Sequence, residues 1–455
     1  MAATLPVPTH RHKPVLSLTS QSSPFYIALV KWRNQLLALF CLFLFAAFGI
    51  FYFRNWVVQK PFAIVLFIGG GLNPNTLAAT RIYAGGADTP LALDSLSYSA
   101  LLKNYSNDFA TPDEAAAASA LATGVKVNNG SSGLGPNGEK LSNLLQLARA
   151  RGRATGLVTN VSLTGPTAAA FYAHTAEPAA GQELARELVE ISKIDVVLGG
   201  GSADFLPVSK GGRRTDDRDL LLDVRRGGYD LARTRAELEA IPRWRRPRLF
   251  GVFNTAELGF AGESEARAEQ PSLADMVRRG IELLQFNRGG YLLVVDAGLM
   301  RKAAQENRAE QTLLETIELD RAVSVALRYA GRNSSVFVCG DVSVGGLSLN
   351  GFPYRADSGI AVLGLNSTGD PWLTWATGPN GPPRLRPKPD AAGDPATPPS
   401  SSTSDGALEE PAALRTESAL HVAADTVAFG EGRGAEALHG TLESTALFEI
   451  IRDNL

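Results

Sequence analysis

The sequence contains very little cysteine, with two such residues in 455. Cys41 lies inside an apolar run, and Cys339 lies inside a predicted buried strand. Disulfide frameworks and thiolate zinc sites both need several cysteines at defined spacings, so the sequence excludes both. We interpret the two cysteines as small residues that face a core or lipid.

The sequence also lacks an excess of charge of either sign. Lys and Arg number 44 and Asp and Glu number 46, which gives a formal net charge of -2 at pH 7. No global field therefore draws the molecule toward nucleic acid or an anionic membrane. We predict no nucleic-acid partner, and other partners must be inferred from local features.

The strongest local feature is an uncharged apolar run at residues 36–53. About 18 residues of helix just cross a hydrocarbon core of ~30 Å. We predict a transmembrane signal-anchor helix at residues 35–54, after a polar cytoplasmic tail at residues 1–34. The alternative is a cleaved signal peptide, which the long polar lead and the lack of an A-x-A-like site after Phe53 disfavour.

Basic residues flank this run unequally: Arg11, Lys13, Lys31 and Arg33 precede it, and only Arg54 and Lys60 follow closely. The positive-inside rule then places the N-terminus in the cytoplasm. We predict a single-pass protein of the cell membrane whose main domain lies outside the cytoplasm, in the periplasm if the protein is bacterial.

Residues 61–455 show alternating strand and helix patterns, which a large α/β fold can absorb as one unit. Continuous apolar runs, typical of buried parallel strands, occur at residues 62–68, 154–159, 195–198, 291–295, 335–339 and 359–363. Helical patterns lie between them at residues 141–150, 183–191, 272–284 and 311–329. The alternation predicts an α/β fold with a central, mostly parallel sheet between two helical layers, a three-layer αβα sandwich.

Two segments interrupt this alternation. Residues 210–248 are rich in Arg and Asp, and because the acids are interleaved we interpret them as a solvated surface excursion, not a nucleic-acid patch. Residues 379–411 are dense in Pro, Ser, Asp and Gly with few large apolar side chains. This composition predicts a disordered insert.

Several motifs occur in the order found in one enzyme family. They are FIGGG at 67–71, Asp113 with the helix and loop at 115–130, TGLVT at 155–159, TAAAFYAHT at 167–175, DVVLGGG at 195–201, and the segments 291–298, 340–346 and 421–429. Together they make the chain resemble the alkaline phosphatases from about residue 61 to the C-terminus. One such motif would be weak, but many in one order argue against chance.

The resemblance implies a central sheet between helical layers with metal ions at the carboxyl ends of its strands; it does not imply activity. In-line phosphoryl transfer by this family needs two zinc ions, a nearby magnesium, a serine nucleophile and an arginine that clamps the phosphate. The metals activate the attacking oxygen, stabilise the leaving oxygen and shield a dianionic substrate.

Most positions of this machinery are replaced in the present sequence. Glu114 stands at the position of the nucleophilic serine, and the clamp arginine falls at about Pro178. Metal-ligand positions hold Gly70, Gly165, Arg301, Gln305 and Val342. An arginine is a cation and cannot ligate zinc.

The retained positions are Thr167, Asp341 and His421, with Asp296 as a conservative replacement for a glutamate. A zinc site takes three or four protein ligands, and Asp341 and His421 belong to different metal positions of the family. We therefore expect no catalytic residue, no bound metal and no cofactor. Zinc and magnesium are expected only if a reduced site persists.

Without metals, Glu114, Asp296 and Asp341 would crowd one pocket, where two like charges ~4 Å apart repel by ~4 kcal/mol at an effective dielectric constant near 20. We hypothesise that Arg301 pairs with Glu114 or Asp341 and substitutes an internal cation for the lost zinc.

Structural interpretations exist for the other candidates. We interpret His174 as a hydrogen-bonding structural histidine and Ser119 as a core residue. Asp341 is expected to satisfy backbone donors at a strand end. His421 is equally consistent with packing and with chemistry.

Three functions follow from these observations. The first is a catalytically inactive, membrane-anchored protein with a structural or binding role and a protein partner in a membrane assembly. The alternative is a phosphomonoester hydrolase with a reduced metal site around Asp341 and His421. A third, a metal-free sensor of a phosphate-like ligand, is disfavoured because Glu114 would repel the anion.

Overall fold

A computed structural model describes residues 24–52, 61–177, 180–242, 248–263, 265, 267–331, 333–351, 363–365, 369–382 and 410–455. The chain divides into two compact units, Met1–Gln59 and Lys60–Leu455. Some predictions lie outside the described residues: the first 23 residues of the tail, the clamp position at Pro178, most of the strand at 359–363 and most of the insert at 379–411.

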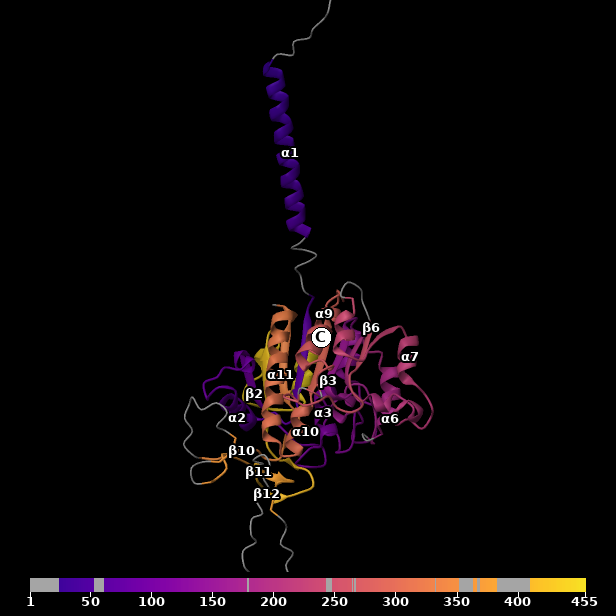
Figure 1. The fold of residues 1–455 in the computed structure, drawn as a ribbon, viewed down its shortest axis with the longest axis vertical. Helices are drawn as coiled ribbons and strands as arrows, with labels where there is room; N and C mark the ends of the chain where they lie inside the picture. Colours follow the sequence, from indigo (N-terminus) through magenta and orange to yellow (C-terminus); the bar gives the residue numbers. More distant parts are fainter. Residues whose placement is uncertain are drawn as a thin grey trace, which may run out of the picture. The chain divides into compact units, whose positions relative to one another are not determined.

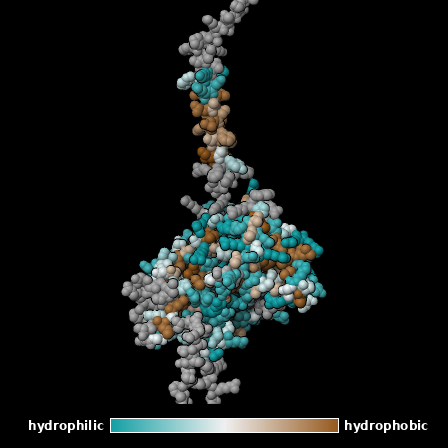
Figure 2. All heavy atoms as spheres, in the orientation of Figure 1, coloured by the Kyte–Doolittle hydropathy of each residue, from teal (hydrophilic) through white to brown (hydrophobic). Residues whose placement is uncertain are grey.

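In the first unit, α1 (Pro24–Tyr52) is one continuous helix. An 18-residue window within Lys31–Tyr52 has a mean hydropathy of 2.2 and none of that window is buried, so the helix is long and apolar enough to span a membrane. Figure 2 shows the apolar side chains along it. A signal sequence near an N-terminus has the same properties, so the distinction between an anchor and a cleaved peptide stays a prediction.

The second unit is built on a ten-stranded sheet, of which Figure 1 labels β2, β3 and β6. Their order across the sheet is β15 (Thr441–Glu443), β2 (Tyr98–Lys103), β14 (Thr426–Glu431), β8 (Ser335–Gly340), β1 (Ala63–Gly69), β7 (Tyr291–Ala297), β3 (Ala154–Ser162), β4 (Val196–Gly200), β6 (Arg248–Val252) and β5 (Tyr229–Ala232). Every pairing is parallel except the two made by β14. The predicted α/β class and mostly parallel sheet are confirmed.

Both faces of this sheet are buried. In β1, Leu66 and Ile68 belong to one core and Val65 and Phe67 to the other, because successive side chains of a strand point to opposite faces. Each large apolar side chain contributes ~1.5–3 kcal/mol when fully buried. Strands buried on both faces read as continuous apolar runs, which is why the sequence revealed them.

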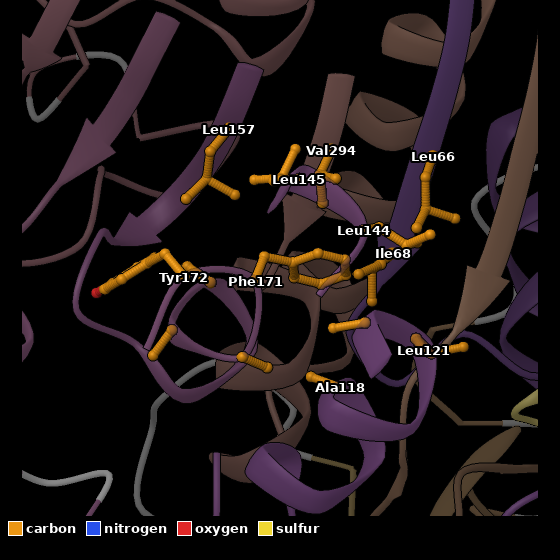
Figure 3. Packing of buried hydrophobic residues seen from close by; sticks show 14 of the residues in the cluster. Leu66, Ile68, Ala118, Leu121, Leu144, Leu145, Leu157, Phe171, Tyr172 and Val294 are labelled. Atoms are coloured by element: carbon orange, nitrogen blue, oxygen red, sulfur yellow. The ribbon is translucent and has the colours of Figure 1, made fainter. Parts of the chain in front are cut away.

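Helices form a layer over each face. Figure 3 shows Phe171 packed among Ile68, Leu144 and Val294 in the first core. The helices of that layer are α3 (Glu114–Thr123), α4 (Leu144–Ala150), α5 (Pro166–Ala169), α6 (Gly181–Glu187), α7 (Leu220–Arg226) and α12 (Ala446–Asn454). The opposite layer holds α8 (Arg235–Ala240), α9 (Leu273–Leu284) and α11 (Ala309–Ala330). The arrangement is the predicted three-layer sandwich.

The strands predicted at 62–68, 154–159, 195–198, 291–295 and 335–339 correspond to β1, β3, β4, β7 and β8. The predicted helices correspond to α4, to α6 with the following π-helical turn η3 (Leu188–Ser192), to α9 and to α11. The solvated excursion at 210–248 is wrong in part: it contains α7, β5 and α8, whose Leu220, Leu221, Val224 and Leu238 are buried. Polar residues on the exposed sides of these elements interrupt the apolar pattern, so the sequence did not reveal them as helices and a strand.

Smaller elements complete the second unit. They include α2 (Pro74–Ala84), the short helix η2 (Ala92–Ser95) and α10 (Leu299–Gln305). A three-stranded sheet joins β10 (Ser348–Leu349), β11 (Leu373–Gly378) and β12 (Ala412–Arg415). The pair formed by β9 (Ser343–Val344) and β13 (His421–Val422) fixes His421 opposite Val344, close in sequence to Asp341.

Candidate functional site

The carboxyl ends of β1, β7 and β8 lie side by side because these strands are parallel neighbours in the sheet. Gly70 follows β1, Asp296 is near the end of β7, and Asp341 directly follows β8. The turn after β7 leads into α10, which carries Arg301. Residues far apart in the sequence therefore meet at one edge, where open α/β sheets place their ligands.

Glu114 is brought to this edge by the start of α3. The side chain of Asp113 caps the helix by accepting a hydrogen bond from the backbone N–H of Ala116, and Gly124 in the left-handed region ends it. All residues of α3 after Glu114 are buried. The helix is thus held in place, and its first residue faces α10.

Arg301 pairs with two carboxylates. Its Nε lies 2.9 Å from Glu114 Oε1, and its Nη1 donates a hydrogen bond to Asp341 Oδ2. The Nε–H has no aligned acceptor, so the contact with Glu114 is ionic and is not a hydrogen bond. Arg301 is 1% exposed and Asp341 2%. The hypothesis that Arg301 pairs with one of these carboxylates is confirmed, and it pairs with both.

Both carboxylate oxygens of Asp341 accept hydrogen bonds. Its Oδ1 accepts from the backbone N–H of Gly71 at 3.1 Å and of Val342 at 2.6 Å. Its Oδ2 accepts from Thr167 Oγ1 at 3.3 Å in addition to Arg301. The expectation that Asp341 satisfies backbone donors at a strand end is confirmed.

Glu114 has neighbours on two sides besides Arg301. Gln305 Nε2 donates to its Oε1 at 2.9 Å, and His421 Nε2 lies 3.9 Å from the same oxygen. His421 Nδ1 is 3.0 Å from the carbonyl oxygen of Pro112, which can only accept, so the imidazole proton sits on Nδ1. Burial raises the pKa of Glu114, but the charge of Arg301, with smaller contributions from His421 and from the hydrogen bond of Gln305, outweighs it and the net shift is downward.

Burial would lower the pKa of Arg301, yet the charges of Glu114 and Asp341 raise it overall. The cation is therefore present at every working pH, and it neutralises carboxylates that would otherwise repel one another. Glu114, Arg301 and Asp341 form an internal ion-pair triad.

Asp296 lies outside this triad. It is fully buried, its Oδ2 accepts from Thr159 Oγ1 at 2.8 Å, and its Oδ1 has no hydrogen-bond partner. Burial raises the pKa of Asp296 to about 7, although the charge of Arg301 acts in the opposite direction. The sequence predicted that Asp296 would share one pocket with Glu114 and Asp341. In the structure Asp296 lies beside the triad, and a pKa of about 7 makes it partly protonated near neutral pH.

Gly70 leaves room for the Arg301 side chain. A Cβ at position 70 would lie 2.8 Å from Arg301 Cβ and 3.0 Å from its Nη1. Real Cβ atoms essentially never show a contact as short as 2.8 Å, so Arg301 would have to shift. The loss of the aspartate implied at position 70 and the presence of an arginine at position 301 are thus sterically linked.

We expect Gly70→Ala to lower the free energy of unfolding by about 1–3 kcal/mol through overpacking against Arg301. Gly280→Ala is the matched control, because a Cβ there meets neighbours only at 3.7–3.8 Å and the residue lies inside α9, where alanine favours the helix. Urea unfolding of both variants checks this. Equal stability of Gly70→Ala and the wild type would show that Arg301 is not packed against Gly70.

Two residues that support the site were not found by sequence reasoning. Asn160 Oδ1 accepts from the backbone N–H of Leu299 at 3.1 Å, and its Nδ2 donates to Glu315 Oε2 at 3.2 Å. This network holds the first turn of α10, two residues before Arg301. The signal in the sequence was Glu315, an acid one turn before Leu319 on the buried face of a helix.

His174 and Ser119 have the structural roles expected of them. His174 Nδ1 is 3.2 Å from Glu187 Oε1, and its Nε2 is 2.9 Å from the carbonyl oxygen of Leu141. Ser119 is fully buried and accepts from the backbone N–H of Gly133 at 3.0 Å. Within the described parts of the chain, no three His, Cys, Asp or Glu side chains gather as a metal site would require.

Comparisons with known proteins identify relatives of the second unit. The family model for alkaline phosphatase matches residues 63–455. The chain is 30% identical over 322 residues to the tissue-nonspecific alkaline phosphatase of Gallus gallus, which covers 60% of this chain and 62% of that protein. It is 27% identical over 299 residues to alkaline phosphatase 4 of Bacillus subtilis, covering 63% and 62%. The chain thus spans about three fifths of the length of these relatives.

Solved structures give the same fold. The alkaline phosphatase of Thermus thermophilus superposes with a TM-score of 0.68 at 22% identity, covering 88% of this chain and 92% of that one. The enzyme of the Antarctic bacterium TAB5 superposes with a TM-score of 0.65 at 19% identity, covering 87% and 98%. At these identities the likeness shows the fold alone.

Proposed function

We propose that this chain, which belongs to the alkaline phosphatase family, is a catalytically inactive relative that uses the phosphatase fold as an anchored scaffold or binding domain. The observation that carries the proposal is the buried triad of Glu114, Arg301 and Asp341. A fixed side-chain cation occupies the pocket whose chemistry in the family, as the resemblance implies, depends on metal ions.

The residues present do not fit zinc or magnesium. Both oxygens of Asp341 already accept hydrogen bonds, and Glu114 is bound by Arg301 and Gln305. At ~4 Å and an effective dielectric constant near 20, a divalent ion would be repelled by a guanidinium by ~8 kcal/mol, twice the value for unit charges. A metal would have to expel Arg301 from a fully packed position.

The position of the nucleophilic serine implied by the resemblance holds Glu114. Ser119 is buried and hydrogen-bonded, so it cannot replace the serine expected at position 114. A glutamate can form an acyl phosphate only where cations bring the phosphate dianion against it. The cation beside Glu114 is Arg301, which is 1% exposed and already paired with two carboxylates.

We further propose that α1 remains in the mature protein as a single membrane anchor with the N-terminus in the cytoplasm, so that the second unit lies outside and meets a protein partner there. This rests on the uncharged apolar run at residues 36–53, on its long polar lead and on the basic residues before it.

The alternative is a phosphomonoester hydrolase with a reduced metal site. One observation favours it: His421 Nε2 lies 3.9 Å from Glu114 Oε1, so an imidazole and a carboxylate do face one another. This pair supplies two donors, fewer than the three or four of a zinc site.

The two functions are separated by assaying the full chain, purified in a neutral detergent, with p-nitrophenyl phosphate in the presence of added zinc and magnesium. We expect no turnover beyond that of Asp341→Asn, and elemental analysis should find well below one zinc per chain. The Asp341→Asn variant controls for contaminating phosphatase. Turnover that this substitution abolishes, together with stoichiometric zinc, would establish the hydrolase instead.

A further inference from the structure

A second polar cavity lies at the opposite edge of the sheet. It has a volume of about 310 Å³ and is lined by Arg149, Gly152, Arg153, Ala154, Asp195, Val196, Arg248, Leu283, Leu284 and Asn287. Ala154, Val196 and Arg248 are the first residues of β3, β4 and β6. Because β3 runs from Ala154 to Ser162 at ~3.3 Å per residue, this edge is on the order of 25 Å from the carboxyl ends of the strands.

The charged side chains of this cavity are unbalanced. Three are arginines, Arg149, Arg153 and Arg248, and one is an acid, Asp195. Asp195 Oδ2 is occupied by the backbone N–H of Thr155 at 2.9 Å and by its hydroxyl at 3.3 Å. The formal charge of the lining is therefore positive.

None of these three arginines forms an ion pair with a carboxylate among the described residues. The guanidinium of Arg248 lies over the Tyr229 ring at 4.6 Å, and that of Arg153 over the Phe62 ring at 4.8 Å. Arginines elsewhere in the second unit are commonly paired with acids: examples are Arg81, Arg186, Arg214, Arg218, Arg278, Arg301, Arg308 and Arg321. Three arginines without a carboxylate partner thus lie around one cavity.

Arg153 has an unused donor. Its Nη1 donates to the carbonyl oxygen of Gly289 at 2.8 Å, but its Nε is buried and has no hydrogen-bond partner. Burial, and after it the charges of Arg151 and Arg433, lower the pKa of Arg153. A buried N–H without an acceptor is unfavourable even on a half-buried side chain, and a bound anion would supply the acceptor.

Two helix C-termini at this edge add negative charge next to the cavity and so reduce its positive potential. α4 and α9 end beside the cavity at Ala150 and Leu284, and each C-terminus carries about half a negative charge. Arg149 in the last turn of α4 offsets one of them. With three arginines and one occupied acid, the balance remains positive.

We propose that this cavity binds a phosphate group of a small anionic ligand, held by Arg149, Arg153 and Arg248. Guanidinium groups match phosphate oxygens in geometry and charge, and aromatic rings beneath Arg153 and Arg248 hold two of them in place. Phe62 follows Tyr52, the last residue of α1, by ten residues in the sequence. The phosphate can therefore come from a soluble phosphomonoester or from a phospholipid head group.

The test uses the full chain in a neutral detergent and titrates it calorimetrically with sn-glycerol 3-phosphate, and separately with phosphatidate in mixed micelles. We expect saturable binding that Arg153→Gln weakens by about tenfold or more, since one charge-assisted contact is lost. Arg149→Gln should weaken binding several-fold. Arg226→Gln is the control, because that arginine is exposed on α7, is paired with Asp223 and does not line the cavity.

Binding of glycerol phosphate identifies a soluble ligand class, and binding of phosphatidate alone identifies a lipid head group; either supports the site if the cavity variants weaken it selectively. If Arg153→Gln does not fold, Arg149→Gln decides, because Arg149 is exposed and its removal leaves the core intact. The proposal is overturned if neither probe binds, or if Arg226→Gln weakens binding as much as Arg149→Gln does.

Discussion

Replacing Arg301 with methionine is expected to lower the free energy of unfolding by about 3–5 kcal/mol, the largest stability loss we predict for a single residue of the site. The substitution keeps the length and apolar stem of the side chain but removes its charge. Glu114 and Asp341 then remain buried or nearly so without a cation, next to Asp296. Urea unfolding of the purified full chain measures the effect.

The size of this loss depends on pH. In the wild type the pKa of Glu114 is lowered, so its contribution to stability is present above its ordinary pKa and is lost as the pH falls through the folded value. In the variant, burial acts without Arg301 and raises the pKa of the same carboxyl, so ionisation at higher pH costs stability. The difference between the two proteins should therefore be larger at about pH 8 than at about pH 5.

Asp296 imposes a trend of its own on the wild type. Its folded pKa of about 7 lies above its ordinary value, so its ionisation opposes folding and stability declines as the pH rises toward and past 7. Because the charge of Arg301 holds this pKa down, the methionine substitution raises it further, so the loss of stability at high pH is greater in the variant and adds to the expected difference.

Arg301→Lys is the matched control for the charge. A lysine retains the cation but cannot present the planar fork that meets two carboxylates at once, so the loss should be intermediate. If the methionine variant were as stable as the wild type at both pH values, the triad would not hold the site together.

The double substitution Arg301→Asp/Gln305→His is expected to change zinc content from well below one per chain to about one. Positions 301 and 305 are one helical turn apart on α10 and therefore lie on the same face. Arg301 Nε and Gln305 Nε2 each lie 2.9 Å from Glu114 Oε1, and His421 Nε2 lies 3.9 Å from that oxygen. Side chains from three positions thus converge on one point.

A carboxylate and two imidazoles make a three-ligand zinc set with an open position. His421 is prepared for this role, because the hydrogen bond from its Nδ1 to the Pro112 carbonyl leaves the lone pair of Nε2 free. Zinc binding by the double variant would show that the fold still presents the geometry of a metal site. It would also show that Arg301 and Gln305 are what prevents zinc binding in the wild type.

Elemental analysis and zinc-dependent thermal stabilisation measure this change; ~2.7 kcal/mol is expected when free zinc is 100 times the dissociation constant. Arg301→Asn/Gln305→Ala is the control of similar size without a ligand pair. His421→Ala in the double variant should remove the binding. A folded double variant that takes up no zinc would mean that the three positions do not converge.

Parts of the fold were visible in the sequence for a simple physical reason. Strands buried on both faces, such as β1 and β7, must be apolar at every position, so they stand out as continuous runs. β2 was missed because it exposes Tyr98, Leu101 and Lys103 and buries only alternate residues. Its six residues carry too weak a pattern to be separated from a loop.

The arginine cavity was not predicted at all. Arg149 lies in the last turn of α4, Arg153 directly before β3, and Arg248 at the start of β6, and each alone looks like an ordinary basic residue at the end of an element. Only the parallel order β3, β4, β6 brings these strand starts together.

The candidate site, too, was predicted only in part from the sequence. From the sequence alone it follows that Glu114 and Arg301 stand where the family resemblance implies a serine and a metal ligand, because identity at a motif position is a local property of the chain. Whether Arg301 meets Glu114, Asp341 or neither depends on contacts across 187 and 40 residues of sequence, which no local pattern contains. The tertiary structure decides it, since the parallel register of β1, β7 and β8 brings their carboxyl ends to one edge and the missing side chain of Gly70 leaves the space that Arg301 fills.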